Sequence, residues 1–334
     1  SSKHVQTNFV QPNYDFISMF SGGLDSASFA SECVRHNHNG ILHHTITHDN
    51  PYGKAKDLYK KYFLNYGKFK LITTRGENRI DNPMYLRTRG LIFLTNIQCL
   101  ASQLKIKNII VPENGPFMIN LGVSSNAEPT RTTNPQMLKD WTEIFNRLTN
   151  SNVQIKTPYI DLTKSEVIIR GGRSSLIDDT WSCSYFQGLS KMCGMCNSCF
   201  VRMLSCYAIN HGEVLEKNYL KNPFTIVQTQ LKQSNLNSYR ISLDAIDFWF
   251  HIIHPDKSKN EFERVRFRTI RKRYPVMYKH SLDMFLGFLN LKNKYFSKEP
   301  IFRRFEKALK NVDSRELKNR ADELLKQKKL VKWI

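Results

Sequence analysis

The segment FISMFSGGLDSASFA (residues 16–30) joins an apolar run to a pair of glycines and then to an expected helix. Residues 16–20 are apolar except for Ser18, which is typical of a strand buried on both faces of a parallel sheet. A helix is expected over residues 25–36, so Gly22 and Gly23 lie in the turn between strand and helix. Such a turn lies at the carboxyl end of its strand, where the ligands of open α/β sheets collect. We therefore expect this loop to surround a small ligand.

The chemistry of the loop indicates that the ligand is an anion. Glycines let successive backbone N–H groups point into one concavity, and the following helix contributes its positive N-terminal end. The hydroxyls of Ser21 and Ser26 add donors, and Asp25 is expected to hold a Mg²⁺ ion that neutralises phosphate. The chain contains neither G-x-x-x-x-G-K-[ST] nor G-x-G-x-x-G, which excludes two common phosphate loops. An ordinary glycine turn with a helix cap is the alternative interpretation.

Strand-like and helix-like patterns alternate through the first half of the chain. This alternation predicts right-handed β-α-β units, and hence an α/β fold with a doubly wound parallel sheet. The expected strands lie at 40–49, 70–74 and 108–114, the last passing into a turn, and the expected helical segments lie at 53–66 and 91–104.

Residues 207–334 differ in pattern and carry most of the excess charge. Apolar residues recur there at helical intervals, which predicts a mainly helical C-terminal region. These residues hold 27 Lys and Arg against 14 Asp and Glu, a net of +13 within a total of +21. The cationic run RVRFRTIRKR (264–273) would suit an acidic protein or a nucleic acid, or else it is one solvated helix face.

Four of the seven cysteines lie within seventeen residues, and their spacing indicates a metal site. In the pattern C-x9-C-x2-C-x2-C, each Cys-x-x-Cys brings two thiolates within reach of one ion. Four thiolates with no open position describe a structural Zn²⁺ site, and an iron–sulfur cluster is the open alternative. The expected ligands are Cys183, Cys193, Cys196 and Cys199.

The N-terminal residues and the cysteines together predict a cytoplasmic protein. Residues 1–15 lack the basic-then-apolar layout of a secretion signal, and no stretch approaches the ~18 apolar residues of a membrane span. Without an export signal, crowded cysteines favour metal binding in a reducing compartment over disulfides. The other cysteines, Cys33, Cys99 and Cys206, are expected to be small core residues.

The loop SGGLDS (21–26) resembles the signature S-G-G-x-D-S of the PP-loop ATP pyrophosphatases, whose fold is Rossmann-like. This resemblance implies that ATP is split between its α and β phosphates, that AMP is left on the substrate and that the loop retains pyrophosphate. It implies that ATP is bound by Ser21, Gly22, Gly23, Leu24, Asp25 and Ser26.

Over residues 15–206 the chain resembles the QueC family, the 7-cyano-7-deazaguanine synthases. The segment TPYIDLTKSEV (157–167) is similar to the family's stretch of Pro followed by T-K-x-E, and TWSC with CGMCNSCFVR is similar to its cysteine motif. The segment YLRTRGLIFL (85–94) is similar to a Tyr-x-x-x-Arg segment that leads into a helix, and PYGKAKD (51–57) stands where the family has a Tyr-Gly turn. The agreement of several separate motifs makes the resemblance specific.

Two cations within these motifs suit a nucleotide site. Lys164 is a compact point charge for pyrophosphate, and the guanidinium fork of Arg89 is able to grip phosphate or carboxylate. Without the motif around it, Lys164 would be read as a surface lysine beside Glu166. We expect Asp25 and Lys164 to be the catalytic residues.

The chain also departs from the QueC pattern. It lacks the Gly-Tyr-Pro-Asp-Cys-Arg-type stretch of that family, and its basic helical region has no counterpart there. In place of that stretch, PENG (112–115) and RTTNP (131–135) resemble the QueC-like branch of bacterial anti-phage operons, the QatC type. This implies that Glu113, Asn114 and Arg131 bind a purine-like edge and a carboxylate; turn chemistry is the alternative for these residues.

The combined pattern predicts an ATP-dependent ligase that adenylates a 7-deazaguanine carboxylate and forms an amide with an amine. The cofactors would be ATP, Mg²⁺ and Zn²⁺, and the amine would be ammonia, as in nitrile-forming synthases, or that of a partner protein in anti-phage defence. The basic C-terminal region is a candidate docking surface for that partner. A PP-loop enzyme that modifies tRNA and an inactive nucleotide-sensing scaffold are the alternatives. The expected organisation is a PP-loop domain (1–182), a zinc segment with four cysteines (183–206) and the helical region (207–334).

Overall fold

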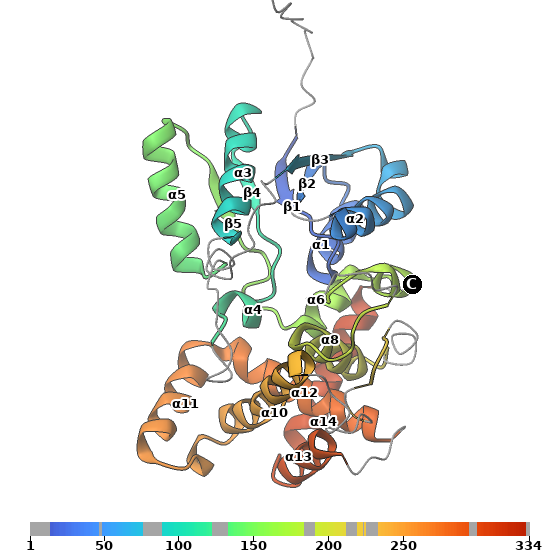
Figure 1. Cartoon of the computed structure of the whole chain (residues 1–334), viewed down its shortest axis with the longest axis vertical. Helices are drawn as coiled ribbons and strands as arrows, with labels where there is room; N and C mark the ends of the chain where they lie inside the picture. The colour runs from blue at the N-terminus through green and yellow to red at the C-terminus, as the bar shows by residue number, and fades with distance from the viewer. Residues whose placement is uncertain are drawn as a thin grey trace, which may run out of the picture.

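A computed structural model gives the structure of the protein. One part of the molecule is a β-sheet with its covering helices, and the other consists of helices from the C-terminal third of the chain (Figure 1). The structure describes residues 14–46, 49–75, 89–121, 133–183, 191–211, 219–222, 224, 233–293 and 299–331.

The sheet has five strands in the order β3-β2-β1-β4-β5, and neighbouring strands pair in parallel. The chain moves outward from β1 through β2 to β3 and then returns to place β4 on the other side of β1. The carboxyl ends of β1 and β4 therefore flank the switch point, where folds of this kind bind their ligands. This confirms the predicted doubly wound parallel sheet. The strands are β1 (Phe16–Met19), β2 (Gly40–Ile46), β3 (Phe69–Arg75), β4 (Asn108–Ile110) and β5 (Gln154–Lys156).

Strand β1 is apolar except for the buried Ser18 because both of its faces are covered. Phe16 packs edge-to-face against Phe29 and Phe69 in the hydrophobic core on one face. Ile17 points the other way, into a second core that contains Ile109. Helices α1, α2, α6 and α7 contribute to the first core, and α3 and α5 to the second. The helices of this part are α1 (Leu24–Arg35), α2 (Asp49–Tyr62), the 3-10 turn η1 (Leu64–Tyr66), α3 (Arg89–Gln103), α4 (Gly115–Ile119), α5 (Pro135–Thr149), α6 (Lys164–Gly171) and α7 (Ser174–Asp179).

One expectation about the isolated cysteines is wrong. Cys33 and Cys206 are buried, but Cys99 is exposed. Helix α3 turns Leu94 and Ile97 toward the sheet, and Cys99 is two positions further on, which places it on the opposite side of the helix.

A third hydrophobic core joins the cysteine segment to the C-terminal helices. Helix α12 approaches α8 so closely that a Cβ atom on Gly287 would lie 2.1 Å from the carbonyl oxygen of Leu204. Phe288 of α12 stacks on Phe305 of α13 with ring centroids 4.4 Å apart. The predicted mainly helical region is confirmed, and the division into three domains stays a prediction. The helices are α8 (Asn197–Ala208), α10 (Gln233–Ile253), the 3-10 turn η5 (Pro255–Lys257), α11 (Glu261–Arg273), α12 (Pro275–Lys292), α13 (Pro300–Leu309) and α14 (Ser314–Leu330).

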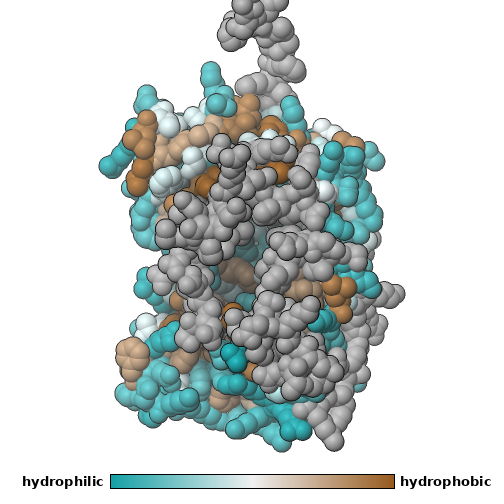
Figure 2. Space-filling model, in the orientation of Figure 1, coloured by the Kyte–Doolittle hydropathy of each residue, from teal (hydrophilic) through white to brown (hydrophobic). Residues whose placement is uncertain are grey.

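Among the coloured residues on the lower, helical part of Figure 2, hydrophilic ones predominate in this view. This agrees with the high proportion of Lys and Arg in the C-terminal third. Within the described part of the chain, none of the helices combines the length and the apolar character needed to cross a membrane.

Candidate nucleotide site and cysteine centre

The glycine loop follows β1 and is shaped by its own hydroxyl groups. The Gly23 N–H donates to Ser21 Oγ at 3.1 Å, and Ser26 Oγ donates to the Gly23 carbonyl at 3.0 Å. Gly22 has φ +76°, and a Cβ atom there would lie 2.8 Å from Ala55 Cα, so both the backbone angle and the space require glycine. Helix α1 begins at Leu24, and the first N–H groups of a helix have no acceptor within the helix. The loop thus presents backbone donors at the switch point.

A buried polar cluster lies directly behind this loop. Lys164 Nζ donates to Asp25 Oδ1 at 2.8 Å, and Asn114 Nδ2 donates to Asp25 Oδ2 at 2.7 Å. The three side chains come from α6, α1 and the N-cap of α4, and each is at most 6% exposed. The ammonium of Lys164 also lies 5.0 Å from the centre of the Phe117 ring. Residues far apart in the sequence therefore meet at one point.

The cluster contains two carboxyl groups with opposite pKa shifts. Burial raises the pKa of Glu113 to about 8, and the nearby charge of Asp25 contributes to this. Asp25 is also buried, but Lys164 and hydrogen bonds from Glu113 and Asn114 outweigh this cost and hold its pKa below the ordinary value. At neutral pH the pair therefore consists of a charged Asp25 and a protonated Glu113, which is able to donate a hydrogen bond.

Lys164 is held in place by the start of its own helix. Thr163 is the N-cap of α6, and its Oγ1 accepts from the Glu166 N–H at 3.3 Å. Glu166 Oε2 accepts from the Thr163 N–H at 2.8 Å, which completes a capping box. The segment T-K-S-E is thus a helix start that fixes the backbone of Lys164 between two capping residues.

The structure brings most of the predicted nucleotide residues together. The loop residues, Asp25 and Lys164 meet at the carboxyl edge of β1, and Glu113 and Asn114 follow β4 beside them. Arg89 is the first residue of α3, but its side chain lies outside the described residues, as does Arg131. Both oxygens of Asp25 already have protein partners, so a Mg²⁺ ion at this residue would have to share them. Mg²⁺ at Asp25 stays a prediction.

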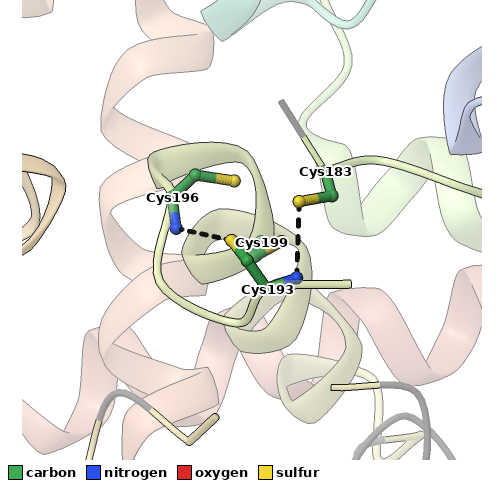
Figure 3. Close-up of side chains that lie close together, drawn as sticks. All are labelled: Cys183, Cys193, Cys196 and Cys199. Atoms are coloured by element: carbon green, nitrogen blue, oxygen red, sulfur yellow. Dashed lines mark hydrogen bonds between the residues drawn. The ribbon is translucent and has the colours of Figure 1, made fainter. Parts of the chain in front are cut away.

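The four predicted metal ligands also converge (Figure 3). The sulfur atoms of Cys183, Cys193, Cys196 and Cys199 all lie within 4.8 Å of one another, and the sulfurs of Cys193 and Cys199 are 3.9 Å apart. A tetrahedral zinc–thiolate site with bonds of about 2.3 Å separates its sulfurs by about 3.8 Å. The cluster could therefore bind Zn²⁺ with little rearrangement.

Backbone groups support this cysteine cluster. The N–H groups of Met195 and Cys196 each lie 3.3 Å from Cys193 Sγ, and the Cys193 N–H lies 3.4 Å from Cys183 Sγ. Such donors stabilise thiolate charge. Gly194 has φ +75°, and a Cβ atom there would lie 1.8 Å from the carbonyl oxygen of Lys221. Glycine is thus required at the tight turn between Cys193 and Cys196.

The sequence did not predict the structural role of two sets of residues that lie near the site. Arg202, matched only as part of the cysteine motif, is fully buried and donates to the Thr180 carbonyl and Ser182 Oγ, each at 3.0 Å. The adjacent Trp181 N–H donates to the Gly22 carbonyl at 3.1 Å, so Arg202 fixes a segment that supports the glycine loop. The other missed feature is a group of buried ionic residues on α12 and α14, described below. Neither has a local sequence signal that reveals its partners.

A strand, an S-G-G-x-D-S loop and a helix at the switch point of a parallel sheet define an α/β nucleotide-binding domain of the PP-loop class. Residues 60–209 match the sequence profile of the family described as Queuosine biosynthesis protein QueC. Over these residues the chain is similar to that family. Helices α10 to α14 lie outside the matched residues.

Relatives found by sequence comparison agree with this match. The 7-cyano-7-deazaguanine synthase of Rickettsia akari (strain Hartford) is 25% identical over 242 residues, which cover 63% of this chain and 98% of the relative. The 7-cyano-7-deazaguanine synthase of Prochlorococcus marinus (strain NATL1A) is 24% identical over 232 residues, which cover 60% and 97%. The protein of the same name from Methanobrevibacter smithii is 36% identical over 75 residues, which cover 21% and 32%. The resemblance to the anti-phage branch stays a prediction.

Proposed function

We propose that the protein is an ATP-dependent ligase that adenylates the carboxylate of a 7-deazaguanine base, such as 7-carboxy-7-deazaguanine, before an amine displaces AMP. The main support is the buried Asp25–Lys164 pair behind a glycine loop that offers backbone donors at the switch point. The names of the relatives support a 7-deazaguanine compound as the substrate class.

The first step is attack of the carboxylate oxygen on the α-phosphorus of ATP. The bond from this phosphorus to the oxygen that bridges to the β-phosphate breaks, and pyrophosphate leaves with the electron pair. The glycine loop would bind the pyrophosphate, with one donor from the Ser21 hydroxyl and another from Ser26 once its hydroxyl rotates away from the Gly23 carbonyl. Lys164 would balance the charge that develops on the pyrophosphate. Mg²⁺ bound with ATP would supply further neutralisation of this charge. We assign Arg89 to the same nucleotide.

The second step is attack of the amine nitrogen on the acyl carbon. The bond from this carbon to the AMP oxygen breaks, AMP leaves and the nitrogen gives up a proton. Protonated Glu113 donates its single proton to Asp25, so its other oxygen is suited to accept from a donor on the edge of the base, and Arg131 is suited to bind the carboxylate of the base. Asn114 already uses its amide groups on Asp25 and the Phe117 N–H, so we assign it to holding Asp25.

The amine could come from ammonia or from a protein. A synthase that uses ammonia and forms the nitrile fits the relatives equally well. A protein amine is favoured by the helical region beyond the family match, where α11 exposes the cations Arg266, Lys272 and Arg273. These cations support a docking surface for an acidic partner protein. A role in anti-phage defence and a cytoplasmic location belong to the same proposal, and they rest on the resemblance of PENG (112–115) and RTTNP (131–135) and on the crowded cysteines. A tRNA substrate would use the same cations to bind phosphates.

The experiment is mass spectrometry of the products from ATP, Mg²⁺ and 7-carboxy-7-deazaguanine, with and without ammonia. AMP, pyrophosphate and free nitrile in the presence of ammonia would identify a synthase. AMP with only adenylate or amide would support the ligase and a protein acceptor. An absence of AMP under every condition would reject the deazaguanine substrate and favour tRNA, and nucleotide binding without turnover of any of these substrates would favour the inactive nucleotide-sensing scaffold.

Metal analysis provides a separate test of the cysteine centre. Zinc bound by the four cysteines would do no chemistry and would stabilise the segment that carries Trp181 and Arg202. One zinc per chain would support the ligase, whereas iron would favour a cluster-dependent tRNA-modifying enzyme.

A further inference from the structure

A buried ionic network connects the C-terminal helices to the helix that carries Lys164. Arg320 of α14 donates from Nε to Asp283 Oδ1 of α12 at 2.7 Å and from Nη1 to Glu166 Oε1 of α6 at 3.0 Å. Arg320 is 3% exposed, Glu166 is 1% exposed and Asp283 is fully buried. Arg320 Nη1 also donates to Glu323 Oε2 at 2.6 Å, and Glu323 is about two-fifths exposed. Loss of Arg320 would be costly, since it would leave the buried carboxylates of Glu166 and Asp283 without this cation.

This network contacts both residues of the α6 capping box. Thr163 Oγ1 donates to Asp283 Oδ2 at 2.5 Å, and Arg320 Nη2 lies 3.3 Å from the same hydroxyl. Glu166, the other capping residue, binds Arg320 directly. Lys164 lies between Thr163 and Glu166 in the sequence, so its backbone is fixed by α12 and α14 while its side chain reaches Asp25 of α1.

We propose that Arg320 and Asp283 are positioning residues for Lys164, and that the C-terminal helices therefore form part of the nucleotide site. The inference rests on the proposed function. It extends that function to residues outside the QueC match, which ends at residue 209. Arg320 and Asp283 would act on the nucleotide indirectly, because they contact α6 and α6 carries Lys164. Their loss would shift the ammonium of Lys164 relative to the glycine loop.

The chain offers a matched control for the loss of an ion pair in the same helices. Arg304 of α13 binds Asp247 of α10 with Nε and Oδ1 2.8 Å apart, and both side chains are about two-fifths exposed. This pair also connects two C-terminal helices through an arginine and an aspartate, but it has no contact with α6 among the interactions of the described residues. Arg304→Met therefore tests whether any lost ion pair in this region affects nucleotide binding.

The experiment measures binding of α,β-methylene ATP, which cannot be cleaved between its α and β phosphates, by titration calorimetry on the full chain. Four variants are compared with the wild-type protein: Arg320→Met, Arg320→Lys, the double variant Arg320→Met with Asp283→Leu, and Arg304→Met. Melting temperatures are recorded in parallel. The double variant removes one of the two buried carboxylates that lose Arg320, while Glu166 keeps the Thr163 N–H and lies 3.8 Å from Lys279 Nζ, and so the double variant restores part of the melting temperature lost in Arg320→Met.

We expect Arg320→Met to weaken binding by about tenfold or more, Arg320→Lys to restore part of it and Arg304→Met to leave it unchanged. The double variant should recover melting temperature but not binding. Equal recovery of both would overturn the inference, because Arg320 would then be merely structural. Tight binding in all variants would also overturn it while leaving the proposed function intact. A wild-type protein that binds no nucleotide would overturn both.

Discussion

Replacement of Gly22 by alanine tests the shape of the glycine loop, and Gly67 provides a control. Both glycines have left-handed backbone angles, φ +76° at Gly22 and +72° at Gly67, so alanine costs about 1–2 kcal/mol at either position from the backbone alone. At Gly67 no atom of the described residues, apart from Gly67 itself and its two chain neighbours, lies within 4 Å of the added Cβ. At Gly22 the Cβ would lie 2.8 Å from Ala55 Cα, about 0.7 Å closer than an ordinary contact of about 3.5 Å between carbons.

The clash at Gly22 has to be relieved by movement of the loop. The neighbouring atom belongs to the backbone of α2, which cannot rotate away as a flexible side chain would. We expect a total cost of about 2–4 kcal/mol in the free energy of unfolding for Gly22→Ala, compared with about 1–2 kcal/mol for Gly67→Ala. Displacement of the loop also strains the bond from the Trp181 N–H to the Gly22 carbonyl.

Binding of α,β-methylene ATP, measured together with urea unfolding, separates the two effects. Gly22→Ala should weaken binding by at least about tenfold, and Gly67→Ala should bind as the wild type does. The reasoning would be refuted by equal binding in the two variants, because the shape of the loop would then not matter for the nucleotide.

Three further results follow from the same structure. Gly194→Ala, whose Cβ would lie 1.8 Å from the Lys221 carbonyl oxygen, should lose most of its bound zinc in elemental analysis, whereas Gly67→Ala should keep the wild-type amount. Burial lowers the pKa of His280 to about 3. As the pH falls from about 6.5 to 3, His280 is therefore protonated in the unfolded chain but stays neutral in the folded chain. Stability is therefore lost over that range, by about 2 kcal/mol at pH 5 for this one residue, and urea unfolding of His280→Gln should show a correspondingly flatter pH dependence. Lys164→Met should remove AMP formation without loss of zinc, and a variant that still forms AMP at the wild-type rate would show that the ammonium is not needed.

The features that sequence alone predicted are those whose signals are local. The apolar run before Gly22 indicated a doubly covered strand, and the spacing of the four cysteines indicated a metal site, because each depends on residues a few positions apart. The prediction that Cys99 is a core residue was wrong. Cysteine is commonly buried, but the position of Cys99 on α3 places its side chain on the exposed side of the helix.

The contacts that position Lys164 could not be predicted, because they join distant segments. Asn114 lies 89 positions from Asp25, and Arg320 lies 154 positions from Glu166. Arg320 occurs in a highly charged helix where most residues are solvated, and only tertiary packing shows that it is buried. Long-range polar contacts of this kind depend on the packing of α6, α12 and α14, which a periodic pattern does not specify.

The most direct test of the central claim is exchange of labelled pyrophosphate into ATP by the purified chain with Mg²⁺ and 7-carboxy-7-deazaguanine. A reversible adenylation predicts that label enters ATP only when the carboxylate is present, that Asp25→Asn abolishes this exchange, and that Arg304→Met leaves it unchanged. Absence of both exchange and AMP with the wild-type protein, or equal exchange in Asp25→Asn, would contradict the account.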